Sequence, residues 1–489
     1  MEPQERDRKH LRGFIITSLE DFSNSFTKAA QLFRSHIEKG NPIRIITHND
    51  ADGIAAGGIL SKVASRLGAR FRTSSWKRVD DKYINDLAKE KLSIVVFSDL
   101  GGGYIDMLSE QLSNVDIIVL DHHLPINVEA PNIIHCNPLL HDIDGSRGIS
   151  GAGVAYLFAK TVDSTNIDLS PLGITGALAD QQDKGKRKTM LELNKIIQAD
   201  AENEGLLETN VDLIFYGYET RPIARACAYT TQPFIPGLSG REDRCLDLLK
   251  EAKIELKDGD RLRALRDLSE DEKRSLFSAL TKHMIYEGCK PEMVHSLMGT
   301  IYTFKKEKPG TALRDAREFA SMLNACARMG RPSLGLAICM GDRNEALREA
   351  EETLDDYRQK IGTYLDWVRK EDRLQEYDNI YALKAGSEID DTIIGVVASI
   401  LLSTGILRNL KPFIATAHAE EGLLKVSARG TMAMKKSGLD LGVIMQKACE
   451  PFEGRGGGHD VAAGAFLPIN DEDEFLRRVD LLVGEQING

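Results

Sequence analysis

The sequence predicts an α/β protein with three parts: a doubly wound parallel sheet, a helical middle domain and a smaller α/β domain at the C-terminal end. Short apolar strands alternate with helical stretches in the first part of the chain, which is typical of a parallel sheet covered by helices. The alternation stops near residue 190, where the sequence becomes polar and helical, and it returns after residue 376. These three observations define the fold class.

The first part contains four expected strands, recognised by their apolar and β-branched residues, at 43–47, 71–76, 93–98 and 115–120. The stretches between them have the length and composition of helices, at 53–67, 81–91 and 105–112. Two further helices are expected at 152–162 and 172–179. We assign residues 1–190 to this domain.

The middle of the chain, residues 191–344, lacks the alternation and predicts a mostly helical domain. Residues 345–376 are densely charged, with apolar residues at helical spacing such as Leu354, Tyr357 and Ile361, which predicts one long amphipathic linker helix. Residues 377–489 form the last domain. Its expected elements are strands at 380–383, 413–416 and 423–428, a buried helix at 393–407 and a glycine-rich loop near the end.

The composition is that of an ordinary soluble protein, with 489 residues, 42% hydrophobic and 28% charged. No apolar run is long enough to cross a bilayer, and the charged N-terminus lacks the apolar core of a secretory signal. The 7 cysteines are scattered without CxxC spacing, so we expect buried thiols in a cytoplasmic protein. The net charge of -11 indicates that any nucleic-acid contact is confined to a local cleft.

Three of the predicted strands run directly into side chains that bind metals. These are His48, Asp50 and Asp52 after the first strand, Asp99 after the strand at 93–98, and Asp121, His122 and His123 after the strand at 115–120. Because the carboxyl ends of parallel strands meet at one rim of a sheet, we expect these side chains to converge.

So many carboxylates at one rim require a cation, because their charges repel one another. Carboxylate oxygens mixed with imidazole suit manganese or magnesium, with zinc or cobalt as alternatives. Asp180, at the end of a predicted helix, can close the site. Taken singly, an Asp after a strand is more often a helix N-cap, and a single His is more often a packed side chain. The convergence of three strand ends favours the metal site.

These motifs resemble the four ordered motifs of the DHH phosphoesterase superfamily: HNDADG at 48–53, Asp99, DHH at 121–123 and GALAD at 176–180. The sequences at 427–429 and 456–464 resemble the DHH-associated C-terminal domain. Asn137-Pro138 and the SGAG sequence at 150–153 are similar to the RecJ branch. The overall size, the middle insertion and residues 313–319 are most similar to archaeal RecJ-like exonucleases, including the form that associates with the GINS replication complex.

The resemblance implies a site for two ions, Mn2+ or Mg2+. One ion would be held by His48, Asp50 and Asp99, and the other by Asp52, Asp99, His122 and Asp180, with Asp99 bridging the two. His123 would support the site or contact the scissile phosphate. Two ions can activate a water and stabilise the leaving oxygen in one displacement, without a covalent intermediate.

A second group of candidates lies in the last domain. Gly456, Gly457 and Gly458 lack a Cβ, so their N–H groups can approach a phosphate closely. His459 can donate to that phosphate, and Arg429 can bind it with two hydrogen bonds. The alternative is that a glycine triplet is only a flexible turn.

Clusters of basic residues are weaker candidates, because such runs are usually solvated surface. The run Lys184, Lys186, Arg187 and Lys188 follows Asp180 and is the better candidate for strand contact, ahead of Lys305, Lys306 and Lys308. Arg314 and Arg317 either guide a strand or pair with neighbouring acids.

The function expected first is a metal-dependent exonuclease of single-stranded DNA or RNA that acts in DNA replication and repair. Polarity from 5′ to 3′ on DNA is implied by the resemblance alone. A small-substrate phosphodiesterase acting on oligoribonucleotides or cyclic dinucleotides is an alternative, as is a pyrophosphatase, although such relatives lack the long insertion. A catalytically inactive replisome scaffold is a further alternative. Such a scaffold would have lost metal ligands that this chain keeps. GINS is a candidate partner.

Overall fold

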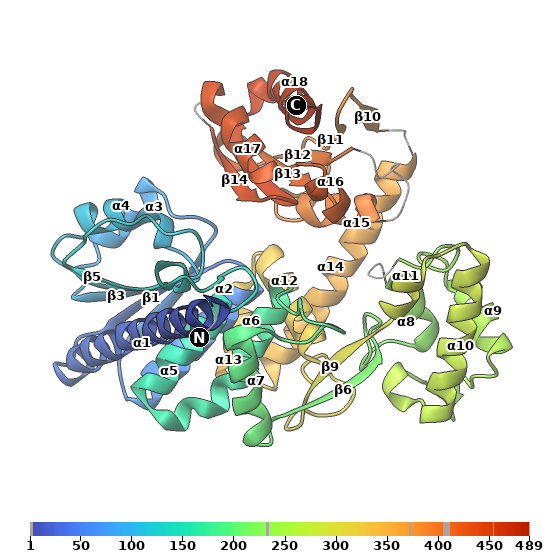
Figure 1. Ribbon diagram of the computed structural model, residues 1–489, viewed down its shortest axis with the longest axis horizontal. Helices are drawn as coiled ribbons and strands as arrows, with labels where there is room; N and C mark the ends of the chain where they lie inside the picture. The colour runs from blue at the N-terminus through green and yellow to red at the C-terminus, as the bar shows by residue number, and fades with distance from the viewer. Residues whose placement is uncertain (1–2, 231–233, 371–372, 404–410, 453, 489) are drawn as a thin grey trace. The chain divides into compact units, whose positions relative to one another are not determined.

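The computed structural model describes residues 3–488 apart from 231–233, 371–372, 404–410 and 453 (Figure 1). The chain forms two compact units. The first comprises Met1–Ala226 and Leu246–Leu354, and the second comprises Cys227–Cys245 and Asp355–Gly489. The α/β fold class predicted from the sequence is confirmed in both.

The first unit is built on a five-stranded parallel sheet with the order β2-β1-β3-β4-β5. Its strands are β1 (Ile43–His48), β2 (Phe71–Trp76), β3 (Ile94–Ser98), β4 (Asp116–Leu120) and β5 (Ile133–Cys136). The strand order reverses between β1 and β3, and ligands of doubly wound sheets bind beyond the carboxyl ends of the strands at such a reversal. The position expected for a site is therefore the rim beyond β1 and β3.

Helices cover both faces of this sheet because buried strands expose apolar side chains on both faces. One face carries Ile46, Val95, Phe97, Ile117 and Val119, which pack with the apolar residues of α3 (Asp81–Ala88) and α4 (Ile105–Gln111). The other face is covered by α2 (Ala51–Arg66) and α5 (Gly151–Val162). Next to them lie α6 (Ser170–Ala179) and α7 (Glu192–Asn203).

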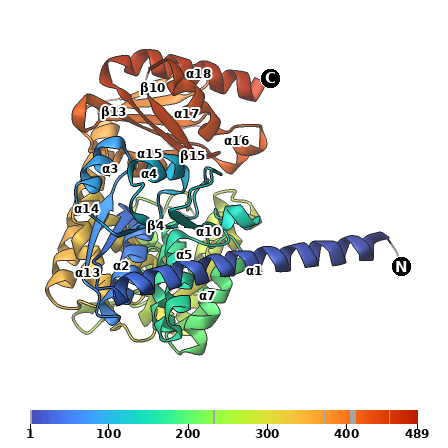
Figure 2. The ribbon, with the colours of Figure 1, turned by 90° about the vertical axis from the view of Figure 1, so that its left-hand side faces the viewer.

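Helix α1 (Pro3–Glu38) and strand β5, both within the first 190 residues, were not predicted. Helix α1 lies along α5 (Figure 2). The rings of Phe33 and Phe158 meet edge to face between the two helices. The buried α1 residues Phe22, Phe26, Ala29, Ala30 and Phe33 follow helical spacing, so the signal was present within a charged sequence. Strand β5 has only four residues, and β4 supplies its pairing.

The middle of the chain is mostly helical, as predicted, with two small antiparallel pairs of strands. One pair joins β6 (Leu207–Leu213) to β9 (Met298–Phe304), and the other joins β7 (Lys257–Asp258) to β8 (Arg261–Leu262). The helices are α8 (Ile223–Tyr229), α9 (Glu242–Glu251), α10 (Glu270–Tyr286), α11 (Pro291–His295), α12 (Ala316–Arg328) and α13 (Pro332–Met340). Helices α12 and α13 pack back onto α2, and α12 also packs onto α6.

The long amphipathic helix is present as α14 (Glu345–Lys370), but the prediction that it reaches residue 376 was wrong. Leu374–Glu376 is strand β10, which pairs antiparallel with β11 (Tyr381–Lys384). The end of α14 and strand β10 are both polar, so the composition did not show where the helix ends and the strand begins.

The second unit contains a mixed six-stranded sheet with the order β10-β11-β12-β13-β15-β14. The remaining strands are β12 (Phe413–His418), β13 (Leu423–Arg429), β14 (Arg455–His459) and β15 (Ala462–Pro468). Helices α17 (Leu441–Cys449) and α18 (Glu472–Asn488) contribute to one apolar core with this sheet, while α15 (Ile394–Ser403) packs on β12 and β13. A short helix, α16 (Met432–Lys436), completes the unit. Residues 404–407 of the predicted helix lie outside the described residues.

The predicted glycine-rich loop is a strand. Gly456, Gly457 and Gly458 belong to β14, which pairs antiparallel with β15 at the edge of the sheet. None of the helices among the described residues is both long and apolar enough to span a membrane.

Candidate metal centre

The first group of side chains lies at the junction of β1 and α2. His48 ends β1, and Asp50 is the N-cap of α2, where its Oδ1 accepts a hydrogen bond from Gly53 N at 2.9 Å. The other oxygen of Asp50, Oδ2, lies 2.8 Å from His48 Nδ1. Asp50 can therefore be a helix N-cap and a metal ligand at once, because one oxygen caps the helix and the other faces the rim.

Asp99 occupies the centre of the group. It follows β3 directly and has φ 60, a left-handed conformation that few residues other than glycine adopt. Its side chain is 1% exposed. Oδ2 lies 3.5 Å from His48 Nδ1, and Oδ1 lies 3.2 Å from His122 Nε2 and 3.8 Å from His123 Nδ1. Neither buried oxygen has a hydrogen-bond partner among the described residues.

The three residues after β4 divide into a ligand candidate and its support. Asp121 is buried and accepts hydrogen bonds from Gly102 N, His122 N and His123 N. His123 Nδ1 donates to Asp121 Oδ1 at 2.8 Å. Burial alone would raise the pKa of Asp121, but His123, His122 and these donors hold it well below its usual range. Asp121 is therefore a carboxylate, and it orients the loop and the His123 ring.

Asp52 and Asp180 complete the group around His122. The His122 Nε2 atom lies 3.4 Å from Asp180 Oδ2 and 3.8 Å from Asp52 Oδ2. Asp180 caps the end of α6, and Asp52 is held at the start of α5 by the N–H groups of Gly151, at 2.7 Å, and Ala152, at 2.9 Å. A helix N-terminus stabilises a carboxylate in this position.

Two glycines make room for the carboxylates. A Cβ on Gly151 would overlap the Asp99 carboxylate, and a Cβ on Gly176 would overlap Asp52 Oδ1. This close approach gives a physical reason for glycine in the SGAG sequence at 150–153 and in the GALAD sequence at 176–180.

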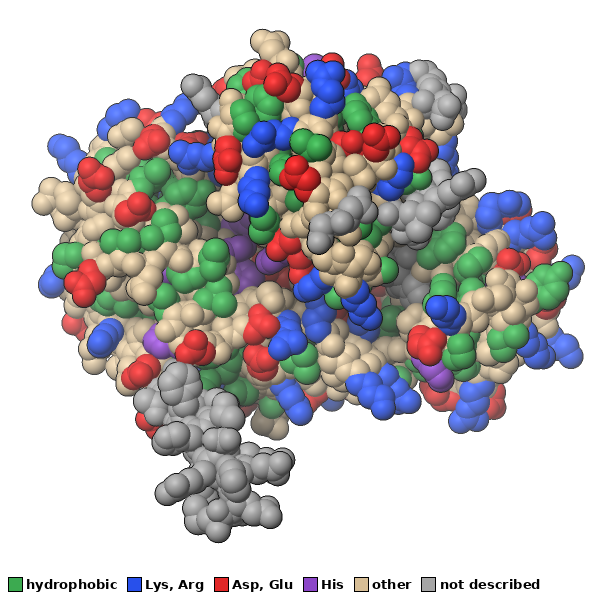
Figure 3. All heavy atoms as spheres, turned by 45° about the horizontal axis from the view of Figure 1, so that its top comes forward, with side chains coloured by type: hydrophobic (Ala, Val, Ile, Leu, Met, Phe, Trp, Pro, Cys, Tyr) green, Lys and Arg blue, Asp and Glu red, His purple; other side chains and the backbone are tan. Residues whose placement is uncertain are grey.

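The structure thus brings all six predicted ligands within reach of one another. Three sets, each offering atoms within 4.8 Å, are His48, Asp50 and Asp99; Asp52, His122 and Asp180; and Asp99, His122 and His123. On the face shown in Figure 3, histidine side chains gather beside acidic ones. Asp99 belongs to two sets and has two oxygens, so neighbouring cation positions would share its carboxylate.

The electrostatics of the group fit a divalent cation. Burial raises the pKa of Asp52 well above its usual range, and the neighbouring carboxylates of Asp99 and Asp180 add to the shift. Burial alone would lower the pKa of His48, but Asp50 and Asp99 outweigh it and raise the pKa well above its usual range. Without a metal, protons must therefore balance the carboxylates. The buried atoms His48 Nδ1, His122 Nε2 and both Asp99 oxygens make no hydrogen bond within the described part of the chain, and they are the donors that an ion needs.

The candidate phosphate-binding residues lie in the second unit. Arg429 on β13 and His459 on β14 both pair with Ala462 of β15, so they flank that strand at one level of the sheet. The Arg429 side chain donates to Ser399 Oγ at 2.9 Å and to the carbonyl oxygen of Ala428 at 2.9 Å.

The three glycines of β14 differ in their surroundings. A Cβ on Gly456 would overlap Met445 O of α17 and lie 2.9 Å from Cys449 Sγ. Gly458 has φ +136, and its Cβ would lie 2.6 Å from Ala463 Cα. Only Gly457 faces open space, with nothing within 4 Å. Packing explains two of the glycines, and Gly457 is the one that leaves room for a ligand.

Most residues of the two basic clusters are exposed at the surface, while some basic side chains in or near them pair with acids. Arg317 pairs with Asp183 at 2.6 Å, and Lys188 lies 3.9 Å from the same carboxylate. Arg314 lies 3.7 Å from Glu219. Arg317 and Arg314 therefore form their close ion pairs with acids of distant segments, Asp183 and Glu219.

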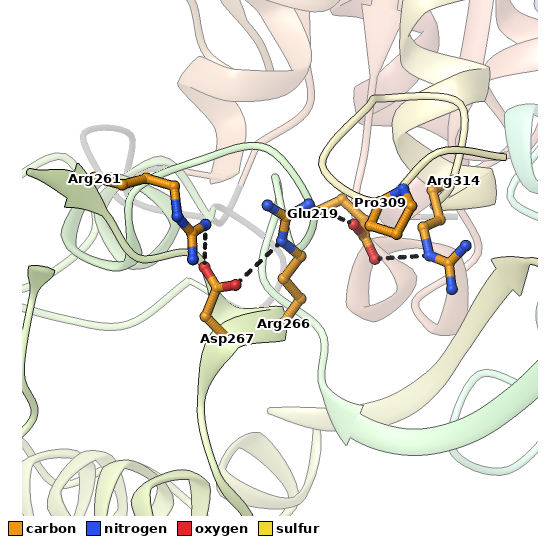
Figure 4. A pocket seen from close by; sticks show the side chains of 6 residues that line it. All are labelled: Glu219, Arg261, Arg266, Asp267, Pro309 and Arg314. Atoms are coloured by element: carbon orange, nitrogen blue, oxygen red, sulfur yellow. Dashed lines mark hydrogen bonds and ion pairs between the residues drawn. The ribbon is translucent and has the colours of Figure 1, made fainter. Parts of the chain in front are cut away.

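A pocket of about 470 Å³ in the middle of the chain is lined by Glu219, Arg261, Arg266, Asp267, Pro309 and Arg314 (Figure 4). Its basic and acidic side chains alternate, and Glu219 also accepts a hydrogen bond from Gly310 N at 3.0 Å. The charged side chains of this pocket pair with one another.

Three domain families match the chain. The N-terminal domain of the DHH family matches residues 42–180, a DHH-CID domain matches residues 215–298, and a DHHA1 domain matches residues 378–485. An uncharacterised protein of Methanocaldococcus jannaschii is 33% identical over 451 residues, which cover 91% of this chain and 94% of that protein. The single-stranded-DNA-specific exonuclease RecJ of Thermus thermophilus is 27% identical over 164 residues, or 31% of this chain and 24% of that enzyme.

Solved structures share the fold. RecJ of Thermus thermophilus in complex with Mn2+ is 18% identical, with a TM-score of 0.58, over 94% of this chain and 55% of that chain. CDC45 of Entamoeba histolytica is 14% identical, with a TM-score of 0.64, over 94% of this chain and 99% of that chain. At these identities the similarity establishes the arrangement of the elements and nothing further.

Proposed function

Because this chain belongs to the RecJ-like branch of the DHH phosphoesterase superfamily, we propose that it is a two-metal exonuclease that hydrolyses single-stranded nucleic acid. The observation that carries the proposal is the central position of Asp99, whose carboxylate belongs both to the set with His48 and Asp50 and to the set with His122. Shared ligands are what a pair of ions at one scissile bond requires.

Each side chain has a role under this proposal. His48, Asp50 and Asp99 hold one ion, and Asp52, Asp99, His122 and Asp180 hold the other, as Mn2+ or Mg2+. Ions held there would supply activation of a water and neutralisation of charge on the leaving oxygen. Since His123 Nδ1 donates to Asp121, its other ring nitrogen is the one left to contact a phosphate oxygen. Arg429, His459 and the backbone of Gly457 bind a phosphate of the strand, flanked by Gly456 and Gly458.

The proposed substrate is a single strand with a free end, and the proposed polarity on DNA is 5′ to 3′. The printed name of the Thermus thermophilus relative, a single-stranded-DNA-specific exonuclease, supports the substrate. The division at residues 190, 344 and 376 is our proposal for a catalytic domain, a middle domain, a linker and a substrate-binding domain. The matches to DHH, DHH-CID and DHHA1 domains fall within the first, second and fourth of these ranges.

A second candidate is a scaffold of the replication machinery, with GINS as its partner. It is favoured by the similarity to CDC45, which extends over 99% of that chain. The presence of Asp99 and of the other five candidate ligands near it supports an active nuclease instead. One protein can have both roles. A measurement of nuclease activity decides whether this protein is an enzyme or only a scaffold. An oligoribonuclease or cyclic-dinucleotide phosphodiesterase is the remaining alternative.

The test is a time course with Mn2+ on labelled DNA and RNA oligomers that are free, blocked at the 5′ end or blocked at the 3′ end. A blunt duplex, a closed single-stranded circle and a cyclic dinucleotide serve as further substrates. We expect stepwise shortening of free strands, resistance of the circle and the duplex, and protection by a 5′ block.

Rapid cutting of the circle would show an endonuclease, and cutting of the cyclic dinucleotide alone would favour the small-substrate enzyme. Protection by the 3′ block alone would reverse the polarity. No hydrolysis of any substrate, in a preparation that binds Mn2+, would favour the scaffold. Chelation of the metal by EDTA is the control for each reaction.

A further inference from the structure

A backbone carbonyl of the first unit holds the ring of His122. The oxygen of Gly145 lies 2.6 Å from His122 Nδ1. A carbonyl oxygen can only accept a hydrogen bond, so Nδ1 must carry the proton and Nε2 is the atom left to face the carboxylates. The same oxygen accepts a second hydrogen bond, at 3.1 Å, from the side-chain amide of Gln182.

The Gln182 amide also holds the other end of this loop. Its Nε2 donates to Ile149 O at 3.2 Å, and Ile149 directly precedes the helix start at Ser150. The N–H groups of Gly151 and Ala152 at this start are the ones that bind Asp52. One amide group therefore connects the segment that orients His122 to the segment that orients Asp52.

Gln182 is itself fixed by a second buried amide. Its Oε1 accepts a hydrogen bond from Asn194 Nδ2 at 2.7 Å, and the backbone N–H of Asn194 donates to Gly148 O at 2.9 Å. Gln182 is 1% exposed and Asn194 is 0% exposed. Burial of polar amides is unfavourable unless their hydrogen bonds are made. Both hydrogen bonds that the side-chain amide of Gln182 donates go to carbonyl oxygens of the loop at 145–149.

This loop packs tightly against the backbone of His122. A Cβ on Gly145 would overlap the carbonyl oxygen of His122. A movement of the loop would therefore shift the His122 backbone and release its ring at the same time. Gln182 also lies two residues beyond Asp180, so its position is coupled to a third candidate ligand.

We propose that Gln182 is a positioning residue of the metal centre, which acts through the Gly145 carbonyl on His122 and through the start of α5 on Asp52. The proposal rests on the two-metal site described above. Residues that orient metal ligands through hydrogen bonds typically change metal affinity about ten- to a hundredfold when they are replaced.

The experiment compares Mn2+ affinity, measured by titration calorimetry, with the melting temperature of the metal-free protein. Gln182→Met keeps the length of the side chain and removes its hydrogen bonds, so we expect Mn2+ affinity to fall about ten- to a hundredfold. Gln182→Glu cannot donate to either carbonyl and should weaken Mn2+ binding at least as much.

The matched control is Asn166→Leu, which also removes a buried amide from the first unit. Asn166 donates to Ala159 O at 3.0 Å and accepts from Arg66 at 2.7 Å, and it contacts none of the candidate ligands. We expect a lower melting temperature for this variant with unchanged Mn2+ affinity. An equal loss of affinity in the control would show that general destabilisation is sufficient, and the proposal would fail.

A second variant keeps the proposal testable if Gln182→Met does not fold. Asn194→Ser replaces the amide that fixes Gln182 with a shorter side chain and keeps the backbone hydrogen bond to Gly148, so we expect a smaller loss of Mn2+ affinity. Unchanged affinity in the folded variants overturns the role of Gln182 while leaving the metal site intact. If the wild-type protein itself binds no Mn2+, the proposed function fails instead, so the two failures are distinguishable.

Discussion

The carboxylate of Asp52 occupies the space that a side chain at Gly176 would need. Replacement of this glycine by alanine should therefore push Asp52 away from the N–H groups that hold it. We expect Gly176→Ala to weaken Mn2+ binding at least tenfold and to lower the free energy of unfolding by about 1–3 kcal/mol, as overpacking does. Calorimetric titration and urea unfolding measure the two effects.

The control for this substitution is Gly362→Ala in α14, where a Cβ would meet nothing within 4 Å. Alanine is the better helix former, so this variant should gain about 0.5–1 kcal/mol of stability with unchanged Mn2+ binding. Mn2+ binding by Gly176→Ala at the wild-type affinity would show that Asp52 is not a ligand.

Asp99→Asn should separate metal binding from stability. Asparagine has nearly the same shape and tolerates the left-handed backbone at this position, where φ is 60. The substitution removes one charge from a crowded set of carboxylates, so the metal-free protein should melt at the same temperature or higher. Hydrolysis and Mn2+ affinity should both fall at least about a hundredfold, because Asp99 serves both ions under the proposal. Substantial turnover in this variant would contradict the two-metal site.

The glycines of β14 should respond differently to alanine. Gly456→Ala meets the backbone of α17 and should cost about 1–3 kcal/mol of stability. Gly457→Ala meets open space and should leave stability nearly unchanged, but it should weaken the binding of a single-stranded oligomer. Fluorescence anisotropy with labelled oligomers, beside thermal melting, checks both. Wild-type affinity in Gly457→Ala would exclude a close phosphate contact there.

The pH dependence of stability should reveal Asp180. Burial raises the pKa of Asp180 to about 6, although the nearby charge of His122 opposes the shift. A pKa raised by folding means that the native state holds the proton more tightly, so this contribution to stability is lost as pH rises through 6. In EDTA, the free energy of unfolding of the wild type should therefore fall between about pH 4.5 and about pH 7.5, relative to that of Asp180→Asn. These two pH values lie on either side of the titration of Asp180.

Addition of Mn2+ should reverse this trend above the pKa, because the ion replaces the proton at the carboxylate. Urea unfolding at both pH values, with and without Mn2+, measures the effect. An identical pH profile for the wild type and Asp180→Asn would show that Asp180 does not titrate in this range.

The sequence predicted the parallel sheet and the rim because both depend on local patterns. Apolar β-branched runs such as residues 94–98 identify the strands, and parallel strands bring residues such as His48, Asp99 and His122 to one edge. Asp50 shows the limit of choosing between alternatives, since it caps α2 and faces His48 at once.

Features that depend on contacts between distant segments were not predictable. The glycines of β14 form a strand only because β15 pairs with them and α17 packs behind them. Gln182 gives no signal in the sequence, since its role depends on two carbonyls more than 30 residues away, at Gly145 and Ile149. The end of α14 was misplaced because the strand after it has the same polar character.

The packing of α12 and α13 against α2 has a consequence for synthesis of the protein on the ribosome. The N–H of Ala51 donates to Asn324 at 3.3 Å, Lys62 donates to the carbonyl oxygen of Met340 at 2.9 Å, and Gly335 lies tightly against Ile54. Helix α2 starts with the candidate ligands, yet its outer face is covered by residues that follow 273 to 278 positions later in the chain. A nascent chain that ends before α13 therefore exposes apolar surface of α2. The ligand-bearing rim can reach its final packing only after translation has passed Met340.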